Sequence, residues 1–213
     1  IIGVSEKKAK NILSKFFKTI TNKIEWMKIE SAEMTKHALN SFLATSIIFA
    51  NEIASVCEKV GADASEVERG LKTDNRIGKK AYLSPGNPIA GGTLLRDVNF
   101  LNNKKKKLKL QLPLLSSLVI SNNIHKNWIS KKLLEKFDKI SNLSISVWGL
   151  TYKPYTDSLR RSLSIELCKW LLKKGAKINV YDPIVKKLPK YLNKKVKMYQ
   201  QPLKTLKNSD VLV

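Results

Sequence analysis

The sequence predicts an α/β protein with an all-helical middle and, towards the C-terminus, a parallel sheet of Rossmann type. Apolar residues recur at helical spacing through the middle of the chain, between recognisable helix starts and stops. After Ser141, the apolar runs ISVWGL and KINVYDP alternate with helical segments, which is the pattern of parallel strands joined by helices. With 213 residues, of which 43% are hydrophobic, the chain can bury a substantial core.

The first 30 residues read as strand, helix and strand, namely IIGV, a helix from Glu6 to about Thr19, and KIEWMKI. This pattern is the tail of an α/β unit, so we expect residues 1–30 to complete a domain that begins upstream. The chain opens without Met and closes on the apolar run DVLV, and we expect it to be an internal fragment of a longer protein.

Residues 31–140 form the predicted helical region. A long amphipathic helix runs to Gly61, a natural stop, with Ser31 as its expected N-cap. A second helix opens at Ser65, which has Glu68 at the spacing of a capping box.

Two further helices and a long loop complete this region. One helix begins at Arg96 or Asp97, and another runs from Pro113 to Phe137, since proline suits the first turn of a helix. The loop over residues 73–93 is rich in glycine, which permits close approach of a ligand, and in stiffening proline. It is either an ordinary long connection or a segment built around a ligand.

The last region, residues 141–213, alternates strands and helices. After the strand ISVWGL we expect a helix over 163–174 with Ser162 as N-cap, and then the strand KINVYDP. A weak helix, a strand near VKMY, a short helix to Asn208 and the strand DVLV follow.

The net charge of +23 raises the hypothesis of a nucleic-acid partner, as does the run KKKK at 104–107. Arginine, which reads phosphates and guanine bidentately, occurs at only five positions, and the lysines are spread over every predicted element. The lysine run also falls at the expected end of a helix, where the helix dipole favours cations. We therefore do not expect nucleic acid as the partner.

Two cysteines, Cys57 and Cys168, lie in amphipathic helical patterns without the spacing of a disulfide framework or a metal site. We interpret both as core thiols. No apolar run approaches the roughly 18 residues of a membrane helix, and the N-terminus lacks the layout of a secretory signal. We expect a cytoplasmic protein with no metal and no membrane partner.

Glu33, Lys36 and Asn40 are spaced by three and four, which places them on one face of the long helix. They are either the polar face of an amphipathic helix or part of a site in which an ammonium and a carboxamide donate jointly to a forming oxyanion. Asp97, which follows Arg96, either caps the helix that starts there or orients a group for proton transfer.

The stretch GLTYKPYTDSLRRS follows the first strand of the C-terminal sheet. Ligands of open α/β sheets bind at the carboxyl ends of the strands. Lys153 and Arg160 suit phosphates there, although a solvated basic loop is the alternative.

Together these segments resemble the nucleotide-sugar dehydrogenases of the UDP-glucose/GDP-mannose dehydrogenase family, over essentially the whole chain. The family's Glu-x-x-Lys-x-x-x-Asn-(Ala/Ser)-Phe pattern stands here as EMTKHALNSF, followed by NEIASVCEKVGAD. Its loop motif Arg-Ile-Gly stands at 76–78. The opening of its C-terminal domain stands as GLTYKPYTDSLRRS, with Tyr-Asp-Pro at 181–183.

The resemblance implies NAD as cofactor, a nucleotide sugar as substrate, and a homodimer. Residues 1–30 would end an NAD-binding Rossmann domain, residues 31–140 would form the dimerisation domain, and residues 141–213 would hold the nucleotide diphosphate. By position, Lys36 and Asn40 would stabilise oxygen at the oxidised carbon, and Asp97 would support proton transfer. The implied substrate contacts are Gly91, Gly92, Arg96, Tyr152 and Lys153, together with Arg76, which would reach the substrate of the neighbouring subunit. Arg160 would lie near the cofactor.

One departure concerns the nucleophile. The family's loop reads Gly-Gly-Ser-Cys-Phe-Pro-Lys-Asp, whose thiolate captures an intermediate aldehyde, whereas this chain reads GGTLLRD with Thr93 and Leu94 in that place. We therefore expect no thioester route to a uronic acid. The parent protein would perform one hydride transfer, oxidise twice through an aldehyde hydrate, or only bind the sugar.

Overall fold

The computed structural model describes residues 1–90 and 92–213, except for the side chain of Lys106. Its contacts divide the chain into two compact units. The N-terminal unit contains Ile1–Ile89 and Thr93–Ser121, and the C-terminal unit is chiefly Asn122–Val213. The domain boundaries expected near residues 30 and 140 remain predictions.

The N-terminal unit opens as predicted, with β1 (Ile2–Gly3), α1 (Lys7–Phe17) and β2 (Trp26–Met27). The two short strands pair in parallel, with Ile2 beside Trp26. Gly3 is required at this place, because a Cβ there would lie 2.8 Å from the backbone of Ile29 at the start of the next helix.

That helix, α2 (Ile29–Val60), is the long helix of the sequence analysis and begins two residues early. Ser31 is therefore not the N-cap, which is Lys28 in extended conformation without a side-chain cap bond. The start is shifted because β2 ends at Met27 and the chain turns directly into the helix. The predicted stop is confirmed, since Gly61 adopts φ of +76°.

α3 (Ala64–Leu71) is capped differently from the prediction. Asp63 is the N-cap, and its carboxylate accepts hydrogen bonds from the backbone N–H of Ser65 (2.7 Å) and Glu66 (3.2 Å). The predicted capping box at Ser65 is wrong because an aspartate stands two residues earlier and takes the cap position. Glu68 instead binds Lys72 and Ser84.

Three helices follow the loop: α4 (Thr93–Leu108), α5 (Pro113–Lys126) and α6 (Trp128–Lys136). Because α4 starts at Thr93, Asp97 lies in its second turn, and the alternative that Asp97 caps the helix is wrong. The predicted helix from Pro113 to Phe137 is interrupted at Asn127, whose φ of −89° and ψ of 3° break the helical run.

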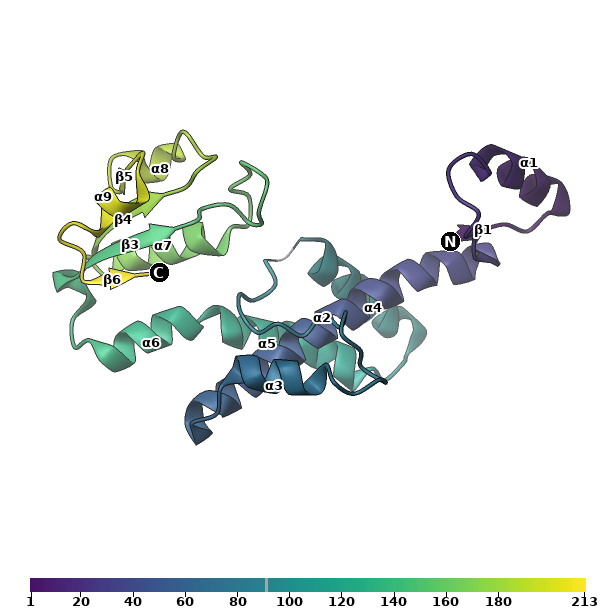
Figure 1. Ribbon diagram of the computed structural model, residues 1–213, viewed down its shortest axis with the longest axis horizontal. Coiled ribbons are helices and arrows are strands. Elements are labelled where there is room, and N and C mark those ends of the chain that lie inside the picture. The colour runs from purple at the N-terminus through teal and green to yellow at the C-terminus, as the bar shows by residue number, and fades with distance from the viewer. Residues whose placement is uncertain (91) are drawn as a thin grey trace. The chain divides into compact units, whose positions relative to one another are not determined.

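The core of the N-terminal unit lies where α2 packs against α4 and α5, as Figure 1 shows. Its side chains are small or branched and almost fully buried, and they come from α2, the loop, α4 and α5. The members are Ala44, Ile48, Ile89, Leu95, Val98 and Leu118. This contact fixes the registry of α2 against α4, and so it decides which polar residues of the two helices meet.

The C-terminal unit contains the predicted Rossmann-type sheet, all parallel and in the order β5-β4-β3-β6 (Figure 1). The strands are β3 (Ser144–Trp148), β4 (Lys177–Tyr181), β5 (Lys197–Met198) and β6 (Val211–Leu212), and the helices are α7 (Leu163–Lys173), α8 (Lys190–Asn193) and α9 (Pro202–Leu206). The predicted cap is confirmed, because Ser162 Oγ accepts from Ile165 N–H at 3.2 Å.

The two faces of β3 differ in chemistry, because side chains alternate along a strand. Ile145 and Val147 share one core cluster with α7. On the other face, the Ser146 hydroxyl donates to the carbonyl of Thr205 and the Trp148 indole donates to the Thr205 hydroxyl, both at 2.7 Å. A hydrophobic face and a hydrogen-bonded face therefore hold the sheet between α7 and α9.

Both cysteines are buried, as predicted. Burial raises the pKa of the Cys168 thiol to about 12, so this thiol stays protonated at neutral pH.

By length and composition, α2 is apolar enough to cross a membrane, with a mean hydropathy of 1.3 over its most apolar stretch. The expectation that no apolar run approaches the roughly 18 residues of a membrane helix is therefore wrong. A third of that stretch (33%) is buried inside the N-terminal unit, and core helices of soluble proteins have the same composition.

Replacing Ile145 by alanine should lower the free energy of unfolding by about 2–5 kcal/mol, because the side chain is fully buried at 0% exposure and a cavity remains. Urea unfolding followed by circular dichroism measures the loss. The matched control is Ile184→Ala, at a position that is 42% exposed, which should cost far less. Equal losses would contradict the placement of the core.

Candidate functional site

The described structure brings Lys36, Asn40 and Asp97 together. Lys36 and Asn40 lie one turn apart on α2, and Asp97 approaches from α4. The Asn40 amide donates to Asp97 Oδ2 in a short hydrogen bond, and Lys36 Nζ donates to Asn40 Oδ1 at 3.4 Å. Asn40 and Asp97 are each only 3% exposed, so this bond is shielded from water.

Asp97 is held as a carboxylate. Burial by itself raises its pKa, but the Asn40 hydrogen bond and the charges of Arg96 and His37 lower it, and the net pKa lies below the ordinary value. An ionised carboxylate only accepts hydrogen bonds. The Asn40 carboxamide must therefore turn its nitrogen to Asp97 and its oxygen to Lys36.

With Asn40 in this orientation, N–H groups of both Asn40 and Lys36 are available to donate hydrogen bonds to a ligand. The Asn40 amide has a second N–H, and the exposed Lys36 ammonium has two protons beyond the one shared with Asn40. Such donors can stabilise an oxygen that becomes negatively charged. Glu33, one turn before Lys36, is exposed and has no hydrogen bond or ion pair among the described residues.

The loop between α3 and α4 is anchored rather than free. Its Gly86 N–H donates to Asn51 Oδ1 at 2.8 Å, and Asn51, on α2, is 2% exposed. Ser84 donates to Glu68 Oε1 at 2.7 Å. Arg76 is exposed and is paired with Asp74 of its own turn, at 2.6 Å.

Residues on either side of the α4 start are placed as follows. Gly91 lies outside the described residues, and Gly92 occupies the bend before α4, with open space where a Cβ would be. Thr93 is exposed, whereas Leu94 packs against the core of the N-terminal unit. Arg96 is exposed, with its Nε 3.5 Å from Asp97 Oδ1.

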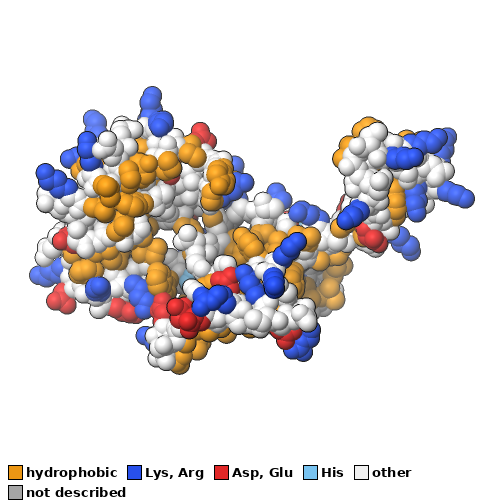
Figure 2. All heavy atoms as spheres, in the orientation of Figure 1, with side chains coloured by type: hydrophobic (Ala, Val, Ile, Leu, Met, Phe, Trp, Pro, Cys, Tyr) orange, Lys and Arg blue, Asp and Glu red, His pale blue; other side chains and the backbone are white. Residues whose placement is uncertain are grey.

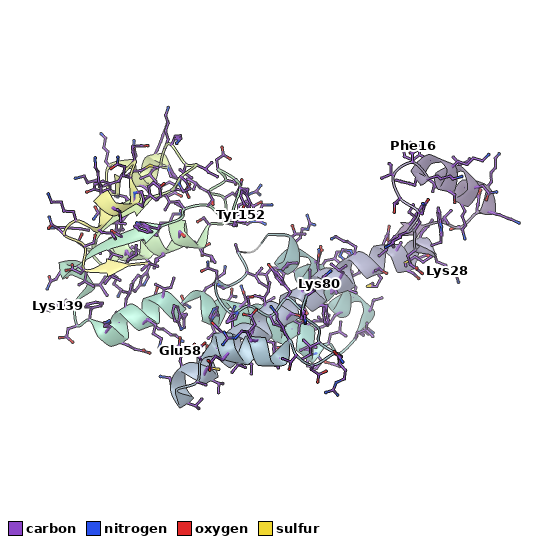
Figure 3. All side chains as sticks on the ribbon, in the orientation of Figure 1. Phe16, Lys28, Glu58, Lys80, Lys139 and Tyr152 are labelled. Atoms are coloured by element: carbon purple, nitrogen blue, oxygen red, sulfur yellow. The ribbon has the colours of Figure 1, made fainter. Side chains whose placement is uncertain are left out.

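In the C-terminal unit, the loop after β3 carries Tyr152, Lys153 and Arg160, all exposed (Figure 3 labels Tyr152). Lys153 Nζ lies 5.5 Å from the centre of the Tyr152 ring. An ammonium beside an aromatic face offers both charge and stacking to a ligand. No contact among the described residues joins Arg160 to these two side chains.

Asp182, at the end of β4, shapes this loop and was not singled out from the sequence. It is 6% exposed, and its carboxylate accepts from the backbone N–H of Leu150 (2.7 Å), Ile184 (2.8 Å) and Val185 (2.9 Å). Burial raises its pKa, but these hydrogen bonds more than offset burial, and the pKa is lowered. Asp182 therefore ties the end of β4 to the end of β3.

Sequence reasoning also missed His37 and Asn51. His37 lies three residues before Asn40 and contacts Asp97, and it is one of only two histidines in the chain. Its place on the same helical face was a usable signal. Asn51 offered none, because only the fold brings Gly86 to it.

Positive charge gathers at a pocket of the C-terminal unit, which is lined by eight lysines: Lys177, Lys186, Lys187, Lys190, Lys194, Lys195, Lys197 and Lys207. Figure 2 shows Lys and Arg side chains scattered over the visible surface of both units, with hydrophobic side chains between them.

Replacing Asn51 by alanine should free the loop over residues 73–92, because the loop loses the acceptor of the Gly86 N–H. Trypsin should then cleave several-fold faster, ~3–10-fold, at the exposed Lys79 and Lys80 (Figure 3). Mass spectrometry of the fragments measures the rates. Asn87→Ala, at an exposed position of the same loop, is the control and should leave the rate unchanged.

Replacing Asp182 by asparagine leaves one acceptor oxygen but turns an NH2 group towards the remaining N–H donor or donors, and it should cost about 1–3 kcal/mol at pH 7. Because folding lowers the pKa of Asp182, its stabilisation is present above about pH 4 and is lost as the pH falls through the lowered pKa. The difference in unfolding free energy between wild type and variant should therefore shrink from pH 7 to pH 2.5. Asp138→Asn, at an exposed position, controls for the change in net charge.

Comparison with known proteins gives two family matches. The model of the UDP-glucose/GDP-mannose dehydrogenase family, central domain, matches residues 30–124, and that of the family's UDP binding domain matches residues 146–213. UDP-glucose 6-dehydrogenase YwqF of Bacillus subtilis is 34% identical over 214 residues, covering 100% of this chain and 48% of that protein. UDP-glucose 6-dehydrogenase of Rickettsia bellii is 35% identical over 188 residues, covering 86% and 43%.

Solved structures agree on the fold. A UDP-glucose dehydrogenase from Pyrobaculum islandicum superposes with a TM-score of 0.86 at 25% identity, over 99% of this chain and 49% of that chain. A UDP-D-ManNAc dehydrogenase from Pyrococcus horikoshii gives 0.80 at 23% identity, over 97% and 47%. The chain thus spans about half the length of the relatives that it matches. With both domain models matched in order along one chain, the protein belongs to the UDP-glucose/GDP-mannose dehydrogenase family.

Proposed function

We propose that the protein containing this chain is an NAD-dependent oxidoreductase that oxidises a CH–OH group of a nucleotide sugar. One observation carries the proposal: Lys36, Asn40 and the buried carboxylate of Asp97 meet between α2 and α4. The ammonium and the carboxamide still have N–H groups that can donate to a ligand. A protein that only bound its ligand would have no use for an oxyanion pair. The match of residues 146–213 to a UDP binding domain supports a nucleotide-sugar substrate.

In this proposal, Lys36 and Asn40 hold the oxygen of the carbon that is oxidised. Negative charge grows on this oxygen as the hydroxyl proton leaves, and the free protons of the ammonium and the carboxamide stabilise it. Asp97 keeps Asn40 in the donating orientation and supports the departure of the proton through a water molecule. Arg76, Gly91, Gly92, Arg96, Tyr152 and Lys153 contact the substrate.

NAD, when bound, supplies the hydride acceptor. Of this chain's residues, Arg160 is proposed to lie near it, and a guanidinium that is exposed on the loop after β3 suits a pyrophosphate.

We further propose that the reaction stops after one hydride transfer. The side chains at the start of α4 are a hydroxyl, Thr93, and a packed aliphatic group, Leu94, and neither replaces a thiolate. Cys57 cannot serve from α2, because it lies 17 residues beyond Asn40 (57 − 40 = 17), which is about 26 Å along a helix. Cys168 is buried in the C-terminal unit and stays a thiol.

We propose a homodimer that forms through α2. Large apolar side chains recur along one side of this helix at positions 42, 49 and 56, a spacing of seven that suits helix packing. They are exposed in the isolated chain, and so are their neighbours at 39 and 60. A second copy of the same helix would remove this stripe from water.

The experiment is to count NADH formed per sugar consumed by the full-length protein, over a panel of UDP- and GDP-sugars. About one NADH per sugar is expected, because no thiol is available for a second step. A Lys36→Met variant is the negative control. Its kcat should fall ~100-fold or more, because the ammonium that stabilises the negative oxygen is removed. About two NADH per sugar would overturn the single-step proposal, and sugar binding without turnover would leave only a binding protein.

A further inference from the structure

The pocket of the C-terminal unit that eight lysines line, here called the lysine pocket, has no part in the proposed reaction. It has a volume of about 1290 Å³, and its described lining contains eight lysines among 19 residues but no arginine, aspartate or glutamate. In the whole chain, lysine makes up 35 of 213 residues. The fold therefore concentrates lysine around this pocket, well above its share of the sequence.

The lysine pocket lies at the amino ends of the parallel strands. Its lining includes the first residues of β3, β4 and β5, which are Ser144, Lys177 and Lys197. Because the strands are parallel, their amino ends meet at one edge of the sheet and their carboxyl ends at the other. The loop after β3, with the proposed substrate contacts, leaves from the carboxyl edge. The pocket is therefore a separate place, beside the edge strand β5 (Figure 1).

Folding brings these lysines together from three segments of the chain. Six of the eight lie between residues 186 and 197, on the stretch that runs from β4 through α8 into β5. Lys177 comes from the start of β4, and Lys207 directly follows α9. The stretch 186–197 by itself would be a solvated basic run. With Lys177 and Lys207 added, ammonium groups surround one hollow.

The positive charge of the pocket is not neutralised by acidic side chains. All eight lysines are exposed, and none of them forms an ion pair among the described residues. Two have contacts with uncharged groups: Lys197 Nζ lies 5.0 Å from the centre of the Tyr199 ring, and Lys186 Nζ donates to the Pro183 carbonyl at 3.4 Å. These ammonium groups are available to an anion from solvent.

Helix ends explain only part of this cluster. Lys194 and Lys207 are the C-caps of α8 and α9, where the helix dipole favours cations without any ligand. The lysines on β4, on β5 and in the loop before α8 do not stand at a helix end. Asp210, just before β6, accepts from Ser144 N–H at 2.8 Å and pairs with no lysine among the described residues.

The lining suits a ligand with several negative charges. Buried apolar residues, Ala176, Ile178 and Val196, also line the pocket. Low-dielectric walls concentrate the field of the charges around a hollow. Lysine binds a phosphate as a point charge, without the paired hydrogen bonds of arginine. The volume also exceeds the roughly 300–1,000 Å³ of pockets for small ligands, which favours an extended anion.

The same lining offers little to a nucleic-acid base. Proteins hold single-stranded nucleic acid by stacking its bases on aromatic rings, with help from arginine. The one aromatic ring of the described lining, Tyr199, already has the ammonium of Lys197 beside it, and arginine is absent from that lining. A phosphate chain without bases fits this chemistry better.

We propose that the lysine pocket binds a linear anion that carries many closely spaced phosphate groups and no bases, for which inorganic polyphosphate is the probe. Lysines from the three segments neutralise successive phosphates of the chain along the amino edge of the sheet. This binding is additional to the proposed oxidation and does not depend on it.

The test measures the affinity of the full-length protein for end-labelled, short-chain inorganic polyphosphate by fluorescence anisotropy, from about 50 to 200 mM salt. The pocket variant carries K186Q, K187Q, K195Q and K197Q. Its affinity should fall at least ~30-fold at the lowest salt. The slope of log affinity against log salt should become shallower by about 3, because each phosphate contact on a single strand contributes about 0.7.

A control variant removes the same charge outside the pocket, at four exposed positions, with K107Q, K131Q, K136Q and K139Q. Its affinity should stay within about threefold of the unaltered protein, because charges far from the ligand are screened by salt. Circular dichroism and thermal unfolding check that both variants fold. Equal losses in the two variants would show that binding follows net charge alone, and the proposal would be wrong.

A second measurement locates the ligand on the unaltered protein, so it does not depend on how a variant folds. Lysines are acetylated with and without polyphosphate, and mass spectrometry gives the rate at each position. Lys177 and Lys207 should be protected ~3–10-fold, together with the lysines of 186–197, because all of them line one pocket. Protection of 186–197 alone would mean that a linear basic run binds the anion, and it would refute the pocket.

Two other anions define the ligand. Single-stranded DNA with the same number of phosphates should bind at least ~10-fold more weakly, because its phosphates lie further apart and its bases find no free ring. Orthophosphate at equal total phosphate should not compete, because it cannot bridge several lysines. DNA that binds as tightly as polyphosphate, or orthophosphate that competes equally, would contradict the proposal. None of these results depends on NADH formation, so they stand whether or not the oxidation is found.

Discussion

The contact between α2 and α4 determines the geometry of the candidate site. At its polar end, the Asn40 amide meets the Asp97 carboxylate in a place where each residue is only 3% exposed. A carboxylate buried to this extent needs hydrogen bonds to stay ionised, and Asn40 supplies one. In return the carboxylate fixes which way the carboxamide points, and this decides where Lys36 and Asn40 can donate.

The packing around this hydrogen bond explains why it forms in one way only. Ala44 and Ile48 of α2 belong to the same buried cluster as Leu95 and Val98 of α4, and close packing of this kind opposes sliding of one helix along the other. A shift of one residue along α2 would turn Asn40 away from Asp97 by about 100°. The apolar core thus positions the polar pair, and the polar pair gains its strength from the water that the core excludes.

The local errors of the sequence analysis share a cause. Ser31 and Ser65 are good cap residues, but Lys28 and Asp63 begin the helices because the preceding strand and the preceding loop end there. Asp97 stands where a cap would suit the expected helix, but the helix starts four residues earlier, at Thr93. Helix starts depend on where the preceding segment ends, and that is a tertiary fact.

Periodicity along the chain was enough to predict the order of the elements, the parallel C-terminal sheet and the spacing that brings Lys36 and Asn40 to one face of α2, because helical and strand periods are local properties. The sequence also predicted that a hydroxyl, Thr93, and an aliphatic side chain, Leu94, directly follow the Gly-Gly pair at 91–92. The folded structure was needed to find that Asp97 meets Asn40, that His37 stacks on Phe100 and that Asn51 anchors Gly86. The two residues in each of these contacts are separated by 35 to 63 positions in the sequence. The local period of a helix cannot specify such a contact, because the contact depends on how the elements pack.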